Sequence, residues 1–128
     1  MAQTKPVVFC VDDDAEVLAA IERDLRQHYK SQYRLIKSGS AQEALEAVRQ
    51  LKQRGTPVAL FLVDQRMPGM TGTEFLTEAR KLFPEAKKVL LTAYADTEAA
   101  IVSINSIGLD HYLMKPWDPP EQKLSGFG

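Results

Sequence analysis

The sequence lacks the features that mark disulfide-rich, secreted and membrane proteins. Its 128 residues include one cysteine, Cys10, so no disulfide can form within the chain. No apolar run approaches the roughly 18 residues that suggest a membrane span. The apolar run near the N-terminus, Val7 to Val11, is too short for a secretory signal. We therefore expect a cytoplasmic protein that does not contact the membrane.

The sequence also lacks an excess of charge of either sign. Lys and Arg total 16 and Asp and Glu total 17, which gives a formal net charge of −1. Proteins that bind nucleic acid non-specifically are usually basic, so we expect no direct contact with nucleic acid. Hydrophobic residues make up 45% of the chain and charged residues 26%, which is ordinary for one globular domain.

Continuous apolar runs, rather than alternating ones, predict buried parallel strands. Three such runs lie at residues 7–11, 58–63 and 89–91, and two weaker candidates lie at 33–36 and 111–114. A helical pattern follows each of the first four strands. The strands and helices therefore alternate, which predicts an α/β fold with a doubly wound, five-stranded parallel sheet and helices on both faces.

Capping residues mark where the predicted helices begin. Asp14 is a good N-cap for the first helix, and that role accounts for this acid without a metal. Ser40 with Glu43, and Thr71 with Glu74, have the spacing of capping boxes at the second and third helices. The predicted helix ends are Gly55, Pro84 and Gly108, and a fifth helix after Pro119 would be short or missing.

Polar side chains follow the predicted strands at their carboxyl ends, where open parallel sheets bind ligands. These side chains are Asp12, Asp13, Asp64, Thr92 and Lys115. Clustered carboxylates repel one another unless a cation is present, and carboxylate oxygens together with phosphate suit Mg²⁺. A carboxylate nucleophile beside a lysine and a hydroxyl can form an aspartyl phosphate.

Four segments carry a resemblance to a known family: VFCVDDDAEVL, LFLVDQRMPGMTGTEFL, VLLTAYAD and HYLMKPW. They resemble the signature blocks of response-regulator receiver domains of bacterial two-component signalling, from about Pro6 to Trp117. The resemblance implies a flavodoxin-like (βα)5 fold over residues 1–128. It also implies a switch that accepts a phosphoryl group from a sensor histidine kinase or a phosphotransfer protein. Such a domain is not an enzyme in the usual sense, because it catalyses only its own phosphorylation and dephosphorylation.

The resemblance assigns a role to each polar residue at the carboxyl ends of the predicted strands. Asp64 resembles the phospho-acceptor, which acts with Thr92 and Lys115 as the catalytic set. Thr92 and Tyr112 match the residues that switch on activation. The implied magnesium ligands are Asp12, Asp13, Asp64 and the backbone carbonyl of Arg66, with Asp12 acting largely through water.

Two other functions remain open. A phosphatase of the haloacid-dehalogenase kind uses an Asp-x-Asp pattern after a strand, which Asp12 to Asp14 fit, but Glu16 stands where Thr or Val is expected. A receiver-like module that binds proteins without phosphorylation is the closer alternative. The run KPWDPPEQKL resembles receivers that continue into an output domain, so we expect the N-terminal part of a longer protein, with homodimer formation left open.

Overall fold

The computed structural model describes residues 5–29, 32–92 and 108–114 of the chain. The described elements are β1 (Val7–Val11), α1 (Ala15–Tyr29), β2 (Arg34–Ser38), α2 (Ala41–Arg54), β3 (Val58–Asp64), α3 (Gly72–Leu82), β4 (Lys87–Thr92) and β5 (His111–Met114). The predicted fourth and fifth helices and Lys115 lie outside the described residues. No described helix has both the length and the apolar character needed to cross a membrane.

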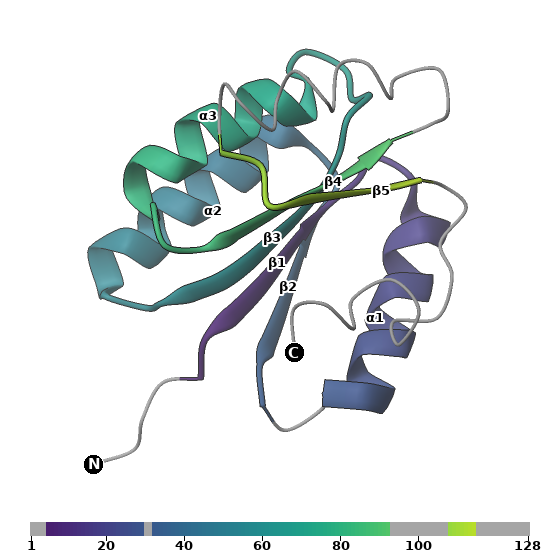
Figure 1. Ribbon diagram of the computed structural model, residues 1–128, viewed down its shortest axis with the longest axis horizontal. Helices are drawn as coiled ribbons and strands as arrows, with labels where there is room; N and C mark the ends of the chain where they lie inside the picture. The colour runs from purple at the N-terminus through teal and green to yellow at the C-terminus, as the bar shows by residue number, and fades with distance from the viewer. Residues whose placement is uncertain (1–4, 30–31, 93–107, 115–128) are drawn as a thin grey trace.

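The five strands form one parallel sheet in the order β2-β1-β3-β4-β5. Helix α1 covers one face of this sheet, and α2 and α3 cover the other (Figure 1). The predicted doubly wound fold is therefore confirmed. The strand order reverses direction between β1 and β3, and such a switch point is where open α/β sheets bind their ligands.

Two strand predictions match the structure and others are off by a few residues. Strands β1 and β5 have the predicted bounds. The prediction for β2 is wrong at both ends, since the strand begins at Arg34 and runs to Ser38. Pairing with β1 sets these bounds, because Val7 lies opposite Arg34 and Val11 opposite Ser38. Strand β2 is an edge strand with exposed and half-buried positions, so its apolar signal is weak.

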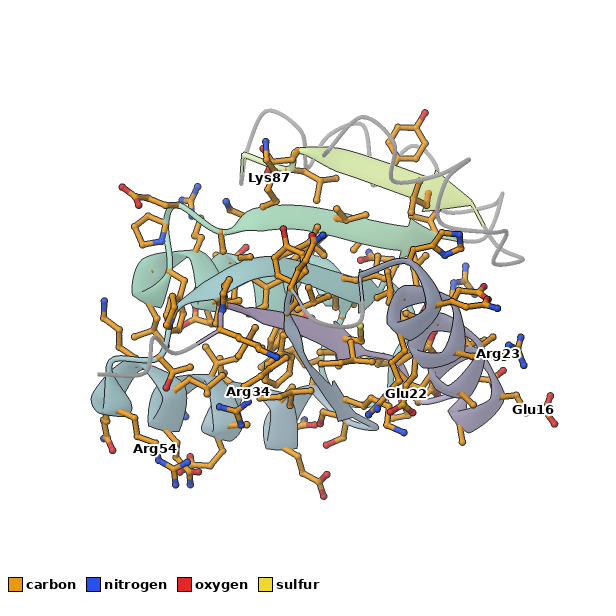
Figure 2. The ribbon with its side chains drawn as sticks, turned by 90° about the horizontal axis from the view of Figure 1, so that it is seen from below. Glu16, Glu22, Arg23, Arg34, Arg54 and Lys87 are labelled. Atoms are coloured by element: carbon orange, nitrogen blue, oxygen red, sulfur yellow. The ribbon has the colours of Figure 1, made fainter. Side chains whose placement is uncertain are left out.

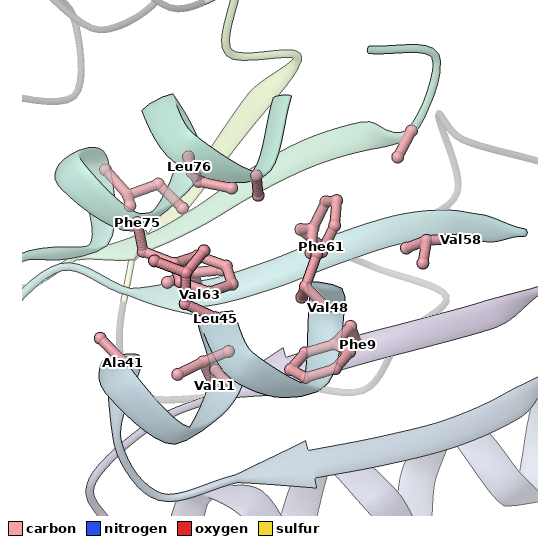
Figure 3. Packing of buried hydrophobic residues seen from close by; sticks show 14 of the residues in the cluster. Phe9, Val11, Ala41, Leu45, Val48, Val58, Phe61, Val63, Phe75 and Leu76 are labelled. Atoms are coloured by element: carbon pink, nitrogen blue, oxygen red, sulfur yellow. The ribbon is translucent and has the colours of Figure 1, made fainter. Parts of the chain in front are cut away.

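The sheet separates two apolar cores. The larger core lies between the sheet and helices α2 and α3, and three aromatic rings form its centre (Figure 3). The Phe61 ring centroid lies 6.1 Å from that of Phe9 and 5.9 Å from that of Phe75. The smaller core lies under α1 and contains Cys10 and Ile21. Alternate residues of β1 enter the two cores, as the two-residue period of a strand requires.

The helix caps fix the chain where it leaves the sheet. Asp14 Oδ1 accepts hydrogen bonds from Glu16 N (2.9 Å) and Val17 N (3.4 Å), which confirms the predicted N-cap of α1. At α3, Thr71 and Glu74 form the reciprocal capping box. At α2, Ser40 Oγ accepts from Glu43 N (3.2 Å), and Gly55 ends the helix in the left-handed conformation with φ 73°.

An ion-pair network joins α1 to the edge of the sheet. Glu22 projects from α1, and its carboxylate binds Lys37 Nζ of β2 (2.7 Å) and the Arg26 guanidinium (2.8 Å) (Figure 2). The hydrogen bond from Lys37 is the main cause that lowers the pKa of Glu22 below its usual value. These side chains are partly exposed, so the network contributes little to stability.

Candidate metal centre

The carboxyl ends of β1 and β3 bring three carboxylates together. Asp12 and Asp13 follow the last residue of β1, and Asp64 is the last residue of β3. The two strands pair side by side, with Val11 opposite Val63. One carboxylate oxygen from each of the three residues lies within 4.8 Å of the others. The three acids therefore lie together, as the sequence predicts, at the switch point of the sheet between β1 and β3.

The three carboxylates differ in exposure and in hydrogen bonding. Asp12 is fully buried and Asp64 is 4% exposed, whereas Asp13 faces solvent. Asp12 Oδ1 accepts a hydrogen bond from Asp14 N (2.9 Å), and Asp12 N donates to Ser38 O at the end of β2 (3.1 Å). The loop that follows β1 is thus held against the sheet at Asp12, whose carboxylate is kept from solvent like that of Asp64, whereas Asp13 faces solvent.

This donor set fits a hard divalent cation. Buried carboxylates at such distances repel one another, and a cation between them offsets the repulsion. Mg²⁺ binds carboxylate oxygens and retains water ligands, for which the exposed side of Asp13 leaves room. Arg66 lies in the exposed part of the loop after Asp64, and the metal ligation expected of its carbonyl stays a prediction.

The loop between β3 and α3 packs tightly against the end of β3. Gln65 N donates to Leu91 O of β4 (2.9 Å), Gly72 N donates to Gln65 O (3.0 Å), and Thr73 N donates to Gln65 Oε1 (3.0 Å). A Cβ atom placed on Gly72 would lie 2.4 Å from Asp64 O. Sequence reasoning missed Gln65, although a glutamine directly after a buried strand is a recognisable polar signal.

Of the remaining predicted site residues, Thr92 lies on β4 and Tyr112 on β5, and Lys115 is outside the described residues. Thr92 ends β4, is fully buried, and follows Leu91, which is opposite Asp64 in the sheet. Tyr112 lies on β5 opposite Leu90, is half-buried, and packs against the larger core. The switch roles of both residues stay predictions, as does the role of Lys115.

Comparisons with known proteins agree on one family. The family model described as response regulator receiver domain matches residues 8–124. The chain is 37% identical over 119 residues to the hydrogenase transcriptional regulatory protein HoxA of Cupriavidus necator, covering 93% of this chain and 23% of that protein. It is 33% identical over 118 residues to the transcriptional regulatory protein AruR of Pseudomonas aeruginosa, covering 91% of this chain and 46% of that protein.

A solved structure shows the same fold. The crystal structure of a CheY-like response regulator receiver domain protein from Methanospirillum hungatei superposes with a TM-score of 0.79 at 31% sequence identity. The match covers 97% of this chain and 91% of that one. The curated relatives are much longer, since the chain spans between about a quarter and about half of their length.

Proposed function

The chain belongs to the response regulator receiver domain family of two-component systems, and from that membership we propose that Asp64 is its phosphoryl acceptor. The observation that carries the proposal is the meeting of Asp12, Asp13 and Asp64, whose carboxylate oxygens lie within 4.8 Å of one another. The family consists of signalling switches, so the phosphoryl group is a signal that the domain holds and then releases.

In the proposed reaction, the donor is a phosphohistidine of a sensor kinase or a phosphotransfer protein. A carboxylate oxygen of Asp64 forms a bond to phosphorus while the bond from phosphorus to the imidazole nitrogen breaks. The freed imidazole nitrogen takes up a proton, and Asp64 becomes an acyl phosphate. Water later attacks the acyl phosphate, which releases inorganic phosphate and restores the carboxylate.

Acids close to Asp64 would oppose the approach of an anionic phosphoryl group unless their charge were offset. Asp12, Asp13 and Asp64 would hold Mg²⁺, which would supply this positive charge. Asp12 is buried and its carboxylate accepts a hydrogen bond from Asp14 N, so it keeps its place, whereas Asp13 is exposed to solvent. Arg66 contributes a backbone carbonyl ligand in this proposal.

Two further strands complete the proposed site. The Thr92 hydroxyl, at the end of β4, hydrogen-bonds one phosphoryl oxygen, and the Lys115 ammonium neutralises another. When Thr92 moves toward the phosphoryl group, Tyr112 on β5 turns into the space behind it. The two side chains thereby bias a two-state surface that an output domain reads. We place this domain in the cytoplasm, where sensor kinases present their phosphohistidine.

The test is chemical phosphorylation read by intact mass. The wild-type chain is incubated with acetyl phosphate with and without Mg²⁺, beside Asp64→Asn and Asp14→Asn. Asp14→Asn is the matched control, because asparagine keeps the N-cap and changes a neighbouring acid outside the carboxylate cluster. We expect one phosphoryl group on the wild type and the control, only with Mg²⁺, and none on Asp64→Asn.

Two outcomes would contradict the proposal. Undiminished labelling of Asp64→Asn would place the acceptor elsewhere. No labelling of the wild type, with the folded state intact by circular dichroism, would favour the phosphorylation-independent binding module that the sequence also allows.

A further inference from the structure

Gln65 joins three elements around the end of the acceptor strand. It follows Asp64 directly, and its side chain is buried although it is polar, with the residue 9% exposed. Its backbone amide donates to Leu91 O of β4, and its carbonyl accepts from Gly72 N of α3. Its side-chain oxygen accepts from Thr73 N of α3 at 3.0 Å. The residue after Asp64 is therefore bonded to both neighbouring elements.

The side-chain bond is not needed to start α3. The first backbone amides of a helix lack partners within the helix, and a capping side chain satisfies one of them. Thr71 already serves as the N-cap and completes a capping box with Glu74. A single hydrogen bond of this kind contributes only about 1 kcal/mol to stability. Helix α3 thus has an N-cap of its own in Thr71, and the Gln65 side chain in addition ties the start of the helix to the end of β3.

The hydrogen bond between Gln65 and Thr73 also holds the loop between Asp64 and α3. The side chain of Gln65 fixes the start of the loop, and the next residue is Arg66. Three residues after Asp64, Met67 packs into the larger core at 8% exposure, so the loop has a second anchor. Loss of the side-chain bond would leave the two backbone bonds of Gln65 in place, so the loop would stay folded with one anchor fewer. Asp64 and Arg66 are the residues on either side of Gln65, so both depend on how firmly it is held.

We propose that Gln65 is a positioning residue for the metal centre: its side-chain bond to Thr73 N holds Asp64 and Arg66 where they bind Mg²⁺ together with Asp12 and Asp13. This inference rests on the proposed function of the same site. Groups that orient metal ligands hold them in the geometry that the metal requires. Losing such a group typically weakens metal binding by about tenfold or more.

The variants separate the hydrogen bond from the size and polarity of the side chain. Gln65→Met keeps a similar shape without the acceptor, and Gln65→Asn keeps an amide that is too short to reach Thr73. The control is Asp110→Ala, which removes another side-chain acceptor for a backbone amide, that of Lys88 N (2.7 Å), at the opposite end of β4.

The measurement is Mg²⁺ affinity by isothermal titration calorimetry, with unfolding in urea in the absence of Mg²⁺ as a separate readout. We expect Gln65→Met and Gln65→Asn to bind Mg²⁺ about tenfold more weakly than the wild type. Asp110→Ala should lose stability like the Gln65 variants but keep wild-type Mg²⁺ affinity.

Each other outcome overturns the inference in a distinct way. Wild-type affinity in Gln65→Met would show that the bond does not position the ligands. An equal loss in Asp110→Ala would show that affinity follows general stability. If the wild type itself binds no Mg²⁺, the proposed function fails first, and that result is separate from any difference between the variants.

Discussion

Replacing Gly72 with alanine tests how closely α3 approaches the end of β3. The added Cβ would lie 2.4 Å from Asp64 O, 3.0 Å from Asp64 C and 2.8 Å from Leu90 Cδ1. The leucine methyl can rotate away, but the backbone carbonyl cannot. Carbon and carbonyl oxygen in contact lie about 3.3 Å apart, so α3 must retreat by about 1 Å.

The expected cost combines three effects. Overpacking in a tightly packed region costs about 1–3 kcal/mol. The retreat also stretches the hydrogen bond from Gly72 N to Gln65 O, now 3.0 Å, which is worth about 1 kcal/mol. Alanine restricts the unfolded chain and returns about 0.4–1 kcal/mol. The net result is a loss of about 2 kcal/mol in the free energy of unfolding.

The assay is equilibrium unfolding in urea, with Gly39→Ala as the matched control. Gly39 has no heavy atom within 4 Å of an added Cβ, and neither glycine has a positive φ. Gly39→Ala should therefore be neutral or slightly stabilising. A midpoint for Gly72→Ala equal to that of Gly39→Ala, with the same dependence on urea, would refute the reasoning.

Two further predictions concern the smaller core and the start of α1. Burial raises the pKa of the Cys10 thiol from 9.0 to about 12, so the folded protein holds this proton more tightly than the unfolded chain. Relative to Cys10→Ala, the free energy of unfolding of the wild type should therefore be constant below pH 9.0 and fall as the pH rises toward about 12. Urea titrations of both proteins across this pH range measure the difference. A difference that does not change with pH would contradict the prediction. Asp14→Ala removes the acceptor for Glu16 N and Val17 N and should lower the free energy of unfolding by about 1 kcal/mol, whereas Asp14→Asn should stay close to the wild type. Equal urea midpoints for these two Asp14 variants would show that the cap is not the cause.

Most of the fold follows from the sequence because its strands are buried on both faces. Val7–Val11 is a continuous apolar run, and the structure gives β1 the same bounds. Strand β2 is harder to predict, since it lies at the sheet edge and its limits come from pairing with β1 rather than from its own apolar residues. The start of β4 at Lys87 is likewise set by pairing with Leu60 of β3.

The candidate site could be predicted in outline only. Strand ends of a parallel sheet meet at one edge, so the meeting of Asp12, Asp13 and Asp64 follows from where the strands stop. The burial of Asp12 and the exposure of Asp13 do not follow, because they depend on the path of the loop. The anchoring of the loop between β3 and α3 by Gln65 does not follow from the sequence either, because it depends on how α3 packs.

The adjacency of β1 and β3 has a consequence for folding kinetics. Helix α1, strand β2 and helix α2 lie between β1 and β3 in the chain, so the pairing of these two strands is non-local and must close a long loop. Non-local pairings form slowly compared with helices and neighbouring contacts. An intermediate in which β1 and β3 have not paired therefore lacks the carboxylate cluster, whatever its helix content. Binding of a divalent cation during refolding would therefore report when β1 and β3 pair.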